Sequence, residues 1–321
     1  MARSAFILGG TGQIGRAAAA RLAERGFDVT LAARSDPGDL EHRFVLVDRG
    51  EPGSLEAAVG EPDVLVDVIP FTRADAEQVV ALAGRVGSVV AISSAAVYGW
   101  ENLPVPIPER HPTVEPGDDD YATRKRAVEL TLLDSRELRA TIVRPGAVHG
   151  PYARQAREWY FVKRALDGRR VVVLAHRGAS RFHTTSVANL AELIRLAAER
   201  PGRRVFNCGD PRPPTALEIG RAVGAAMAHE WTEVLLPGEE QGGVGDHPWN
   251  VSHPFVLDMV EAEIELGYRP VTSYPRAVRA TVDWLVEATR DRPWEEVLAD
   301  ASRMAPLFDY EAEDAHLRGL L

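Results

Sequence analysis

The chain has 321 residues, a length that suggests one sizeable domain with a smaller companion. Apolar residues make up 45% of it and charged residues 26%, which is typical of a globular enzyme. The formal net charge of -10 argues against a nucleic-acid-coating surface, and a single cysteine, Cys208, excludes an internal disulfide. The sequence has neither an apolar run long enough to span a bilayer nor a signal-peptide layout, so we expect a cytoplasmic protein without membrane or nucleic-acid partners.

The N-terminal region predicts a dinucleotide-binding unit. It reads, in order, as strand Ala5–Leu8, glycine loop Gly9–Gly15, helix Arg16–Arg25 and strand Asp28–Ala33. The spacing of Gly9, Gly12 and Gly15 allows a sharp turn and a close approach of the backbone to a pyrophosphate. Gln13 and Ile14 complete this candidate cofactor loop, because the helix that follows presents N–H groups to the phosphates.

The end of the second strand bears on cofactor choice. A site that prefers NAD would place a carboxylate near Ala33 to bind the ribose 2′-hydroxyl, but the next residue is Arg34. Arginine offers a planar set of donors that suits a 2′-phosphate, and Arg16 can add a second positive charge. We therefore expect NADP(H) to be preferred, with NAD(H) as the alternative. Asp48, after the third strand, is a candidate for the adenine amino group or an ordinary turn residue.

Later segments extend the same alternation of strands and helices. Further short apolar runs predict strands at Phe44–Asp48, Asp63–Ile69 and Ser88–Ile92. This order predicts an α/β fold, a Rossmann doubly wound parallel sheet with a smaller C-terminal α/β substrate domain. We assign residues 1–150, plus about 203–210, to the dinucleotide-binding domain, and residues 151–202 and 211–321 to the substrate-binding domain.

A tyrosine and a lysine one helical turn apart suggest acid–base chemistry. Tyr121 and Lys125 open a helix that continues through Leu133, so the two side chains share a face. A phenol is a poor base at neutral pH, but a nearby ammonium stabilises the phenolate and makes its proton easier to transfer. A serine hydroxyl beside the pair can hold the oxygen of a carbonyl or alcohol substrate.

Together these motifs resemble the extended or atypical short-chain dehydrogenase/reductase superfamily, specifically the NAD-dependent epimerase/dehydratase family. Besides the glycine loop and the Tyr-x-x-x-Lys pair, the similar segments are Ser93–Gly99, Arg144–Pro151, Arg181–Ala188, Val205–Gly209 and Leu266–Pro270. The resemblance implies that Ser94 is the catalytic serine, that Pro145 and Val148 lie along the nicotinamide, and that a homodimer is possible.

Three functions remain open from the sequence. Ala95 and Ala96 stand where sugar-nucleotide 4,6-dehydratases carry Asp-Glu, which disfavours that reaction. The first hypothesis is hydride transfer between NADPH and a carbonyl or alcohol substrate, with Tyr121 as the acid or base. The second is an NAD-dependent nucleotide-sugar epimerase, although Arg34 argues against tightly held NAD. The third is a non-catalytic dinucleotide-sensing or RNA-binding protein.

Candidate substrate contacts are few. Arg181 can bind a substrate phosphate or brace the fold, and His149 can contact substrate or form a buried hydrogen bond. Trp249 can cap a pocket or pack against other aromatic residues. The histidines lack metal-ligand spacing, so we expect no metal site.

Overall fold

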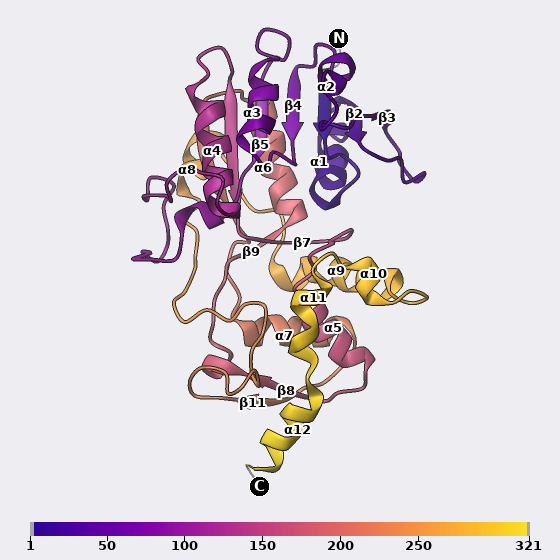
Figure 1. Ribbon diagram of the computed structural model, residues 1–321, viewed down its shortest axis with the longest axis vertical. Coiled ribbons are helices and arrows are strands. Elements are labelled where there is room, and N and C mark those ends of the chain that lie inside the picture. The colour runs from indigo at the N-terminus through magenta and orange to yellow at the C-terminus, as the bar shows by residue number, and fades with distance from the viewer. Residues whose placement is uncertain (1–2, 320–321) are drawn as a thin grey trace. The chain divides into compact units, whose positions relative to one another are not determined.

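The computed structural model describes residues 3–319, which form two compact units (Figure 1). Unit 1 comprises the described residues up to Gly146, together with Val187–Gly209 and Leu257–Val271. Unit 2 comprises Ala147–Ser186, Asp210–Val256 and the described residues from Thr272 onward.

A seven-stranded sheet forms the centre of unit 1, and every neighbouring pair of its strands is parallel. In sheet order the strands are β10 (Arg204–Cys208), β6 (Ala140–Pro145), β5 (Val89–Ile92), β4 (Val64–Asp67), β1 (Ser4–Leu8), β2 (Asp28–Ala33) and β3 (Arg43–Leu46). All residues of β4, β5 and β6 are buried, as expected for central strands covered on both faces. The predicted Rossmann-like sheet is confirmed.

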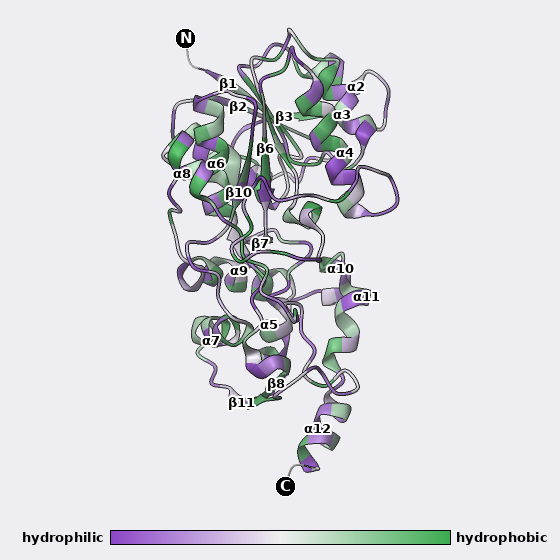
Figure 2. Cartoon of the chain, turned by 90° about the vertical axis from the view of Figure 1, so that its left-hand side faces the viewer, coloured by the Kyte–Doolittle hydropathy of each residue, from purple (hydrophilic) through white to green (hydrophobic). Residues whose placement is uncertain are grey.

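Helices cover both faces of this sheet (Figure 2). They are α1 (Gln13–Ala23), α2 (Ser54–Ala58), α3 (Arg73–Val80), α4 (Tyr121–Asp134), α6 (Val187–Glu199) and α8 (Val260–Leu266), with a short 3₁₀ helix, η1, at Ala95–Tyr98. Helix α1 packs against α6, and α3 packs against α4. The sequence assigned residues 187–202 and 257–271 to the second domain. In the structure they lie in unit 1, because α6 and α8 pack against strands of its sheet.

Unit 2 contains two small parallel sheets and an aromatic core. Strand β8 (Val171–Leu174) pairs with β11 (Thr232–Leu235), and β7 (Ala147–His149) pairs with β9 (Thr184–Ser186). The helices are α5 (Trp159–Leu166), α7 (Ala216–Ala226), α9 (Tyr274–Ala288), α10 (Trp294–Val297), α11 (Ala301–Met304) and α12 (Tyr310–Arg318), with 3₁₀ turns η2 (Ala175–Gly178) and η3 (Ala305–Phe308). Trp249 is buried and stacks on Phe161 at 5.9 Å between ring centroids, so its role in this unit is aromatic packing.

None of the helices formed by residues 3–319 combines the length and the apolar character that a membrane span needs.

Helix α4 is fixed to the sheet of unit 1 by a buried carboxylate. Glu129 is fully buried, and both of its oxygens accept hydrogen bonds from Arg144 of β6, at 2.8 and 2.7 Å. The Ser93 hydroxyl, just after β5, donates to the same carboxylate at 2.6 Å. Arg144 also donates to the Tyr98 hydroxyl at 3.0 Å. This network joins α4 to the carboxyl ends of two central strands.

Removing one partner of this ion pair should destabilise the protein strongly. Arg144→Met leaves the Glu129 carboxylate buried without its main counter-charge, and we expect a loss of about 3–5 kcal/mol in the free energy of unfolding. The measurement is urea unfolding followed by fluorescence and circular dichroism. As a control, Arg290→Met removes an exposed ion pair with Glu287 and should cost at most about 1 kcal/mol.

A double variant tests the cause of the loss. Glu129→Leu with Arg144→Met removes both charges, so it should be more stable than Arg144→Met alone. Equal or lower stability of the double variant would contradict the uncompensated-charge explanation.

Candidate active site

The glycine loop between β1 and α1 has the backbone that its sequence requires. Gly9 has φ +80°, a left-handed conformation that favours glycine. A Cβ on Gly15 would lie 2.4 Å from the Gly9 carbonyl oxygen, so the helix and loop can approach only with glycine there. A Cβ on Gly12 would meet only the Gly9 oxygen, at 3.6 Å. Gly12 is exposed, and as the N-cap of α1 it provides no side-chain cap for the helix.

These features fit a dinucleotide pyrophosphate. The bare, exposed Gly12 allows close approach, and the first turn of α1, which includes Gln13 and Ile14, offers the positive end of a helix dipole. The loop thus offers backbone N–H groups, rather than charged side chains, to a phosphate.

Two arginines lie near this loop in different environments. Arg34 follows β2 and is exposed. Arg16 is held in place, because its Nε donates to the Thr11 carbonyl at 2.9 Å and its Nη2 donates to Asp39 at 2.5 Å. The hydrogen bond from Arg16 lowers the pKa of Asp39. Of these two arginines, Arg16 therefore already has a carboxylate partner, Asp39.

The residues after β3 divide between solvent and interior. Asp48 is exposed, and its Oδ1 accepts a hydrogen bond from the Gly50 amide at 2.9 Å, which is a turn role. Arg49 turns inward, where its Nη1 donates to both Asp67 oxygens at 3.2 and 3.1 Å. Asp67 ends β4 and is fully buried, and this burial raises its pKa although Arg49 opposes the shift. Asp75, on α3, also pairs with Arg49 at 3.2 Å.

Lys125 lies buried at the carboxyl ends of two strands. Its Nζ donates to the carbonyl oxygens of Pro70, which follows β4, and Ile92, which ends β5, both at 2.9 Å. Burial lowers the pKa of Lys125 to about 8, although the charges of Asp67 and others act in the opposite direction. The Nζ also lies 4.8 Å from the centre of the Phe71 ring, in a cation–π contact.

The other two members of the predicted catalytic set lie close by in the fold. Tyr121 begins α4 one turn before Lys125, with 45% of its surface exposed, and the Lys125 Nζ lies 5.8 Å from its ring centre. Ser94 follows β5 and caps η1 by accepting from the Ala96 amide at 3.2 Å. Helix α4 packs against η1, so Ser94, Tyr121 and Lys125 all belong to the carboxyl side of β5.

The remaining predicted residues are divided between the units. Pro145 ends β6 in unit 1 and is buried, whereas Val148 lies in β7 of unit 2 and is half-buried. Arg181, also in unit 2, donates to the Pro213 carbonyl at 2.6 Å.

His149 belongs to a buried network within unit 2. Its Nε2 lies 2.9 Å from Asp210, which also accepts from the Thr184 hydroxyl and the Ser186 amide at 2.7 and 2.9 Å. Burial opposes the charged forms of both His149 and Asp210, but their mutual hydrogen bond and charge attraction outweigh it. The pKa of His149 is raised, and that of Asp210 is lowered to about 2. His149 is only 1% exposed, so the contacts it makes here lie within the interior of unit 2.

The sequence interpretation missed the buried ionic partners around Lys125. Glu129 could have been found, since it lies four residues after Lys125 on the same helical face. Arg49 and Asp67 gave no comparable signal, because their pairing depends on two strand ends meeting in space. Within residues 3–319 there is no cluster of three His, Cys, Asp or Glu side chains arranged to hold a metal ion.

Comparisons with known proteins agree with this fold. A curated relative, 4-hydroxy-2-methyl-3-oxo-4-farnesyl-3,4-dihydroquinoline-1-oxide ketoreductase from Stigmatella aurantiaca, is 29% identical over 234 residues, which are 65% of this chain and 68% of the relative. A UDP-N-acetylglucosamine 4-epimerase from Methanobrevibacter ruminantium M1 has a similar structure, with a TM-score of 0.72, 19% identity, and coverage of 89% of this chain and 99% of that one.

A dTDP-glucose 4,6-dehydratase from Bacillus anthracis str. Ames, solved in complex with NAD, also has a TM-score of 0.72, with 16% identity and coverage of 92% of this chain and all of that one. At these identities the solved structures establish the shared fold. The sequence of residues 5–209, about two thirds of the chain, matches the NAD dependent epimerase/dehydratase family. The chain belongs to this family.

Proposed function

We propose that this protein is an NADP(H)-dependent oxidoreductase that interconverts a ketone and an alcohol. The observation that carries the proposal is the buried Lys125 ammonium at the ends of β4 and β5, one helical turn from an exposed Tyr121. The name of the Stigmatella relative, a ketoreductase, supports the same reaction class.

The chemistry assigned to Tyr121 is proton transfer at the substrate oxygen. In reduction its hydroxyl donates a proton to the carbonyl oxygen, and in oxidation its phenolate accepts the proton of the alcohol. The Lys125 ammonium favours the phenolate, because a nearby positive charge lowers the pKa of a phenol. Two of the three N–H groups of Lys125 donate to carbonyl oxygens, which leaves one for a further partner. Ser94 holds the substrate oxygen with its hydroxyl.

The pKa of Lys125 sets the pH range of this arrangement. Since burial lowers that pKa to about 8, the side chain is an ammonium below pH 8 and a neutral amine above it. The stabilisation of the Tyr121 phenolate is therefore present at neutral pH and is lost as the pH rises through about 8.

Backbone and arginine groups are assigned to cofactor binding. When bound, the dinucleotide supplies or accepts the hydride. The loop at Gly9, Gly12 and Gly15 would hold its pyrophosphate, and Arg34 would bind the 2′-phosphate. The preference for NADP(H) rests on Arg34, because Arg16 is already paired with Asp39.

Removing Arg34 should weaken NADPH binding selectively. We expect Arg34→Ala to raise the Kd for NADPH by about tenfold to about a hundredfold, the size expected for charged hydrogen bonds, and to leave the Kd for NADH unchanged. Calorimetric titration of both cofactors provides the measurement. Arg43→Ala, an exposed arginine at the start of β3, is the matched control. A wild-type protein that binds NADH at least about tenfold more tightly than NADPH would contradict the assignment.

Removing the Tyr121 hydroxyl should slow turnover strongly without affecting cofactor binding. We expect Tyr121→Phe to lower kcat in a ketone panel by about 10²–10⁴-fold, with an unchanged Kd for NADPH. The assay follows cofactor absorbance, and Tyr310→Phe serves as the control. Turnover of a nucleotide sugar without net change in cofactor would instead identify an epimerase. Full activity of Tyr121→Phe would rule out the proposed acid–base role.

A further inference from the structure

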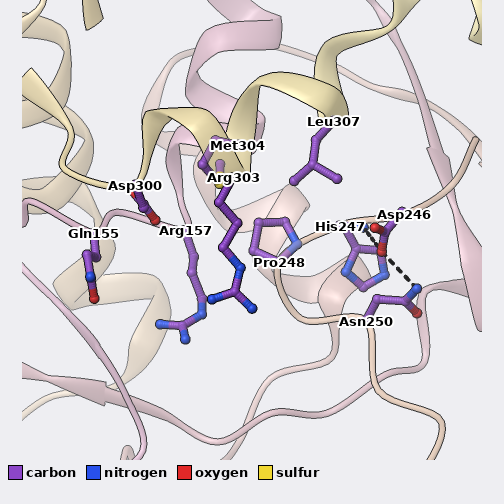
Figure 3. Close-up of a pocket in the computed structure, with 10 residues that line it drawn as sticks. All are labelled: Gln155, Arg157, Asp246, His247, Pro248, Asn250, Asp300, Arg303, Met304 and Leu307. Carbon is purple, nitrogen blue, oxygen red and sulfur yellow. Dashed lines mark hydrogen bonds between the residues drawn. The ribbon is translucent and has the colours of Figure 1, made fainter. Parts of the chain in front are cut away.

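Unit 2 contains a cavity of about 320 Å³ that the proposed function does not use (Figure 3). It is lined by Gln155, Arg157, Asp246, His247, Pro248, Asn250, Asp300, Arg303, Met304 and Leu307. Eight of these ten residues lie after residue 209, beyond the segment that defines the family. The cavity is therefore a feature of the C-terminal part of this chain.

One side of the cavity is a single helical face. Asp300 is the N-cap of α11, Arg303 and Met304 follow it after three and four residues in α11, and Leu307 lies one turn later in the 3₁₀ turn η3. Met304 is buried in the core of unit 2, which anchors this segment. The polar members of the face are thereby held toward the cavity.

The loop opposite presents a histidine whose protonation is defined by its hydrogen bonds. His247 is 3% exposed, and burial lowers its pKa to about 4, so the ring is neutral. Its Nδ1 accepts a hydrogen bond from the Trp249 amide at 3.3 Å. The proton of the neutral ring must then reside on Nε2. This N–H is a buried donor without a hydrogen-bond partner among the residues that the structure describes.

Asn250 complements this donor with an acceptor. Its Nδ2 donates to the Asp246 carboxylate at 2.9 Å, and this contact fixes the orientation of the amide. The Asn250 Oδ1 is consequently an acceptor that no described group satisfies. Asp246 also accepts from the His247 amide at 2.8 Å, so the same carboxylate orders both residues.

Two arginines provide positive charge in the same cavity. In Figure 3 the guanidinium groups of Arg157 and Arg303 extend in the same direction, below Asp300. Asp300 is half-buried, and burial raises its pKa while both arginines act to lower it. Its Oδ1 is a third buried polar atom without a partner among the described residues. The two arginines equal in number the carboxylates of Asp246 and Asp300, and the Asp246 carboxylate already accepts hydrogen bonds from Asn250 and from the His247 amide. Arg157 and Arg303 are thus the cationic donors of the lining, which also offers two acceptors and one neutral donor.

We propose that this cavity binds a small hydroxylated anion, a sugar phosphate or a hydroxy acid. The arginines would bind the phosphate or carboxylate, the His247 Nε2–H would donate to a ligand oxygen, and Asn250 and Asp300 would accept from ligand hydroxyls. A volume of about 320 Å³ is within the range of small-molecule sites and exceeds the roughly 30 Å³ of one water. The site goes beyond the proposed reductase function and does not depend on it.

Calorimetric titration of the full chain with three probes tests the proposal. Glucose 6-phosphate represents sugar phosphates, gluconate represents hydroxy acids, and inorganic phosphate lacks the hydroxylated frame. We expect one of the two hydroxylated probes to bind with a Kd of about 1 mM or lower, and more tightly than phosphate. Without saturable binding of either hydroxylated probe at millimolar concentration, or with phosphate binding equally well, the proposal is overturned.

Variants locate the binding. Arg157→Gln with Arg303→Gln should weaken it at least tenfold, the effect of losing about 1.4 kcal/mol, whereas Arg292→Gln, an exposed arginine of the same C-terminal region, should leave it unchanged. Arg303→Gln alone gives the test if the double variant is unstable, because Arg303 is exposed. Equal loss in Arg292→Gln, or no loss in the arginine variants, would place the binding elsewhere and refute this site.

Two further measurements test whether His247 takes part in ligand binding and whether the site is independent of the proposed reductase activity. Nitrogen-15 spectra of the histidines should show His247 neutral with its proton on Nε2, and that signal should shift when ligand binds. Tyr121→Phe should bind the same ligand normally. Loss of binding in Tyr121→Phe would contradict independence of the two functions, and an imidazole protonated on Nδ1 would contradict the recognition scheme.

Discussion

The buried face of helix α4 determines where the candidate catalytic groups of unit 1 lie. Glu129 is held by Arg144 of β6 and by the Ser93 hydroxyl after β5, and one turn earlier Lys125 binds carbonyl oxygens after β4 and at the end of β5. A carboxylate and an ammonium four residues apart thus attach the helix to three adjacent strands. Unpaired buried charges are costly, so the helix has little freedom to rotate or slide.

This constraint connects fold stability with chemistry. Tyr121 stands at the first turn of the same helix, where the backbone is capped by Asp120 and the side chain is partly exposed. The buried face of α4 fixes the position of the helix on the sheet, and the N-terminal end of the helix carries the Tyr121 phenol. The chain has 37 lysine and arginine residues, and only Lys125 and Lys163 among them are lysines. The choice of lysine at position 125 is therefore unusual for this sequence. Arginine cannot lose its proton in this pH range, whereas a buried lysine can.

Local patterns allowed much of unit 1 to be predicted. The glycine loop, the expected strands and the Tyr121–Lys125 helix depend on residues close in sequence, so periodicity and spacing reveal them. The exact ends were less predictable: α1 begins at Gln13, three residues before the expected start, because Gly12 is its N-cap. The third strand ends at Leu46 rather than Asp48, whose side chain forms a turn with Gly50.

Contacts between distant segments could not be predicted in this way. The Arg49–Asp67 pair joins residues that follow one strand and end another, and the cavity of unit 2 joins three segments spread between Gln155 and Leu307. No motif marks His247, whose chemistry depends on a hydrogen bond from Trp249 and on burial. Which buried polar atoms remain without partners is a property of the packed structure alone.

The charge of the buried Lys125 can be followed by NMR titration of the protein with its lysines labelled with carbon-13 and nitrogen-15. With two lysines in the chain, a Lys163→Arg variant assigns both signals. We expect the Lys125 signal to titrate with a midpoint near 8. A midpoint at the ordinary lysine value of 10.5 would contradict it.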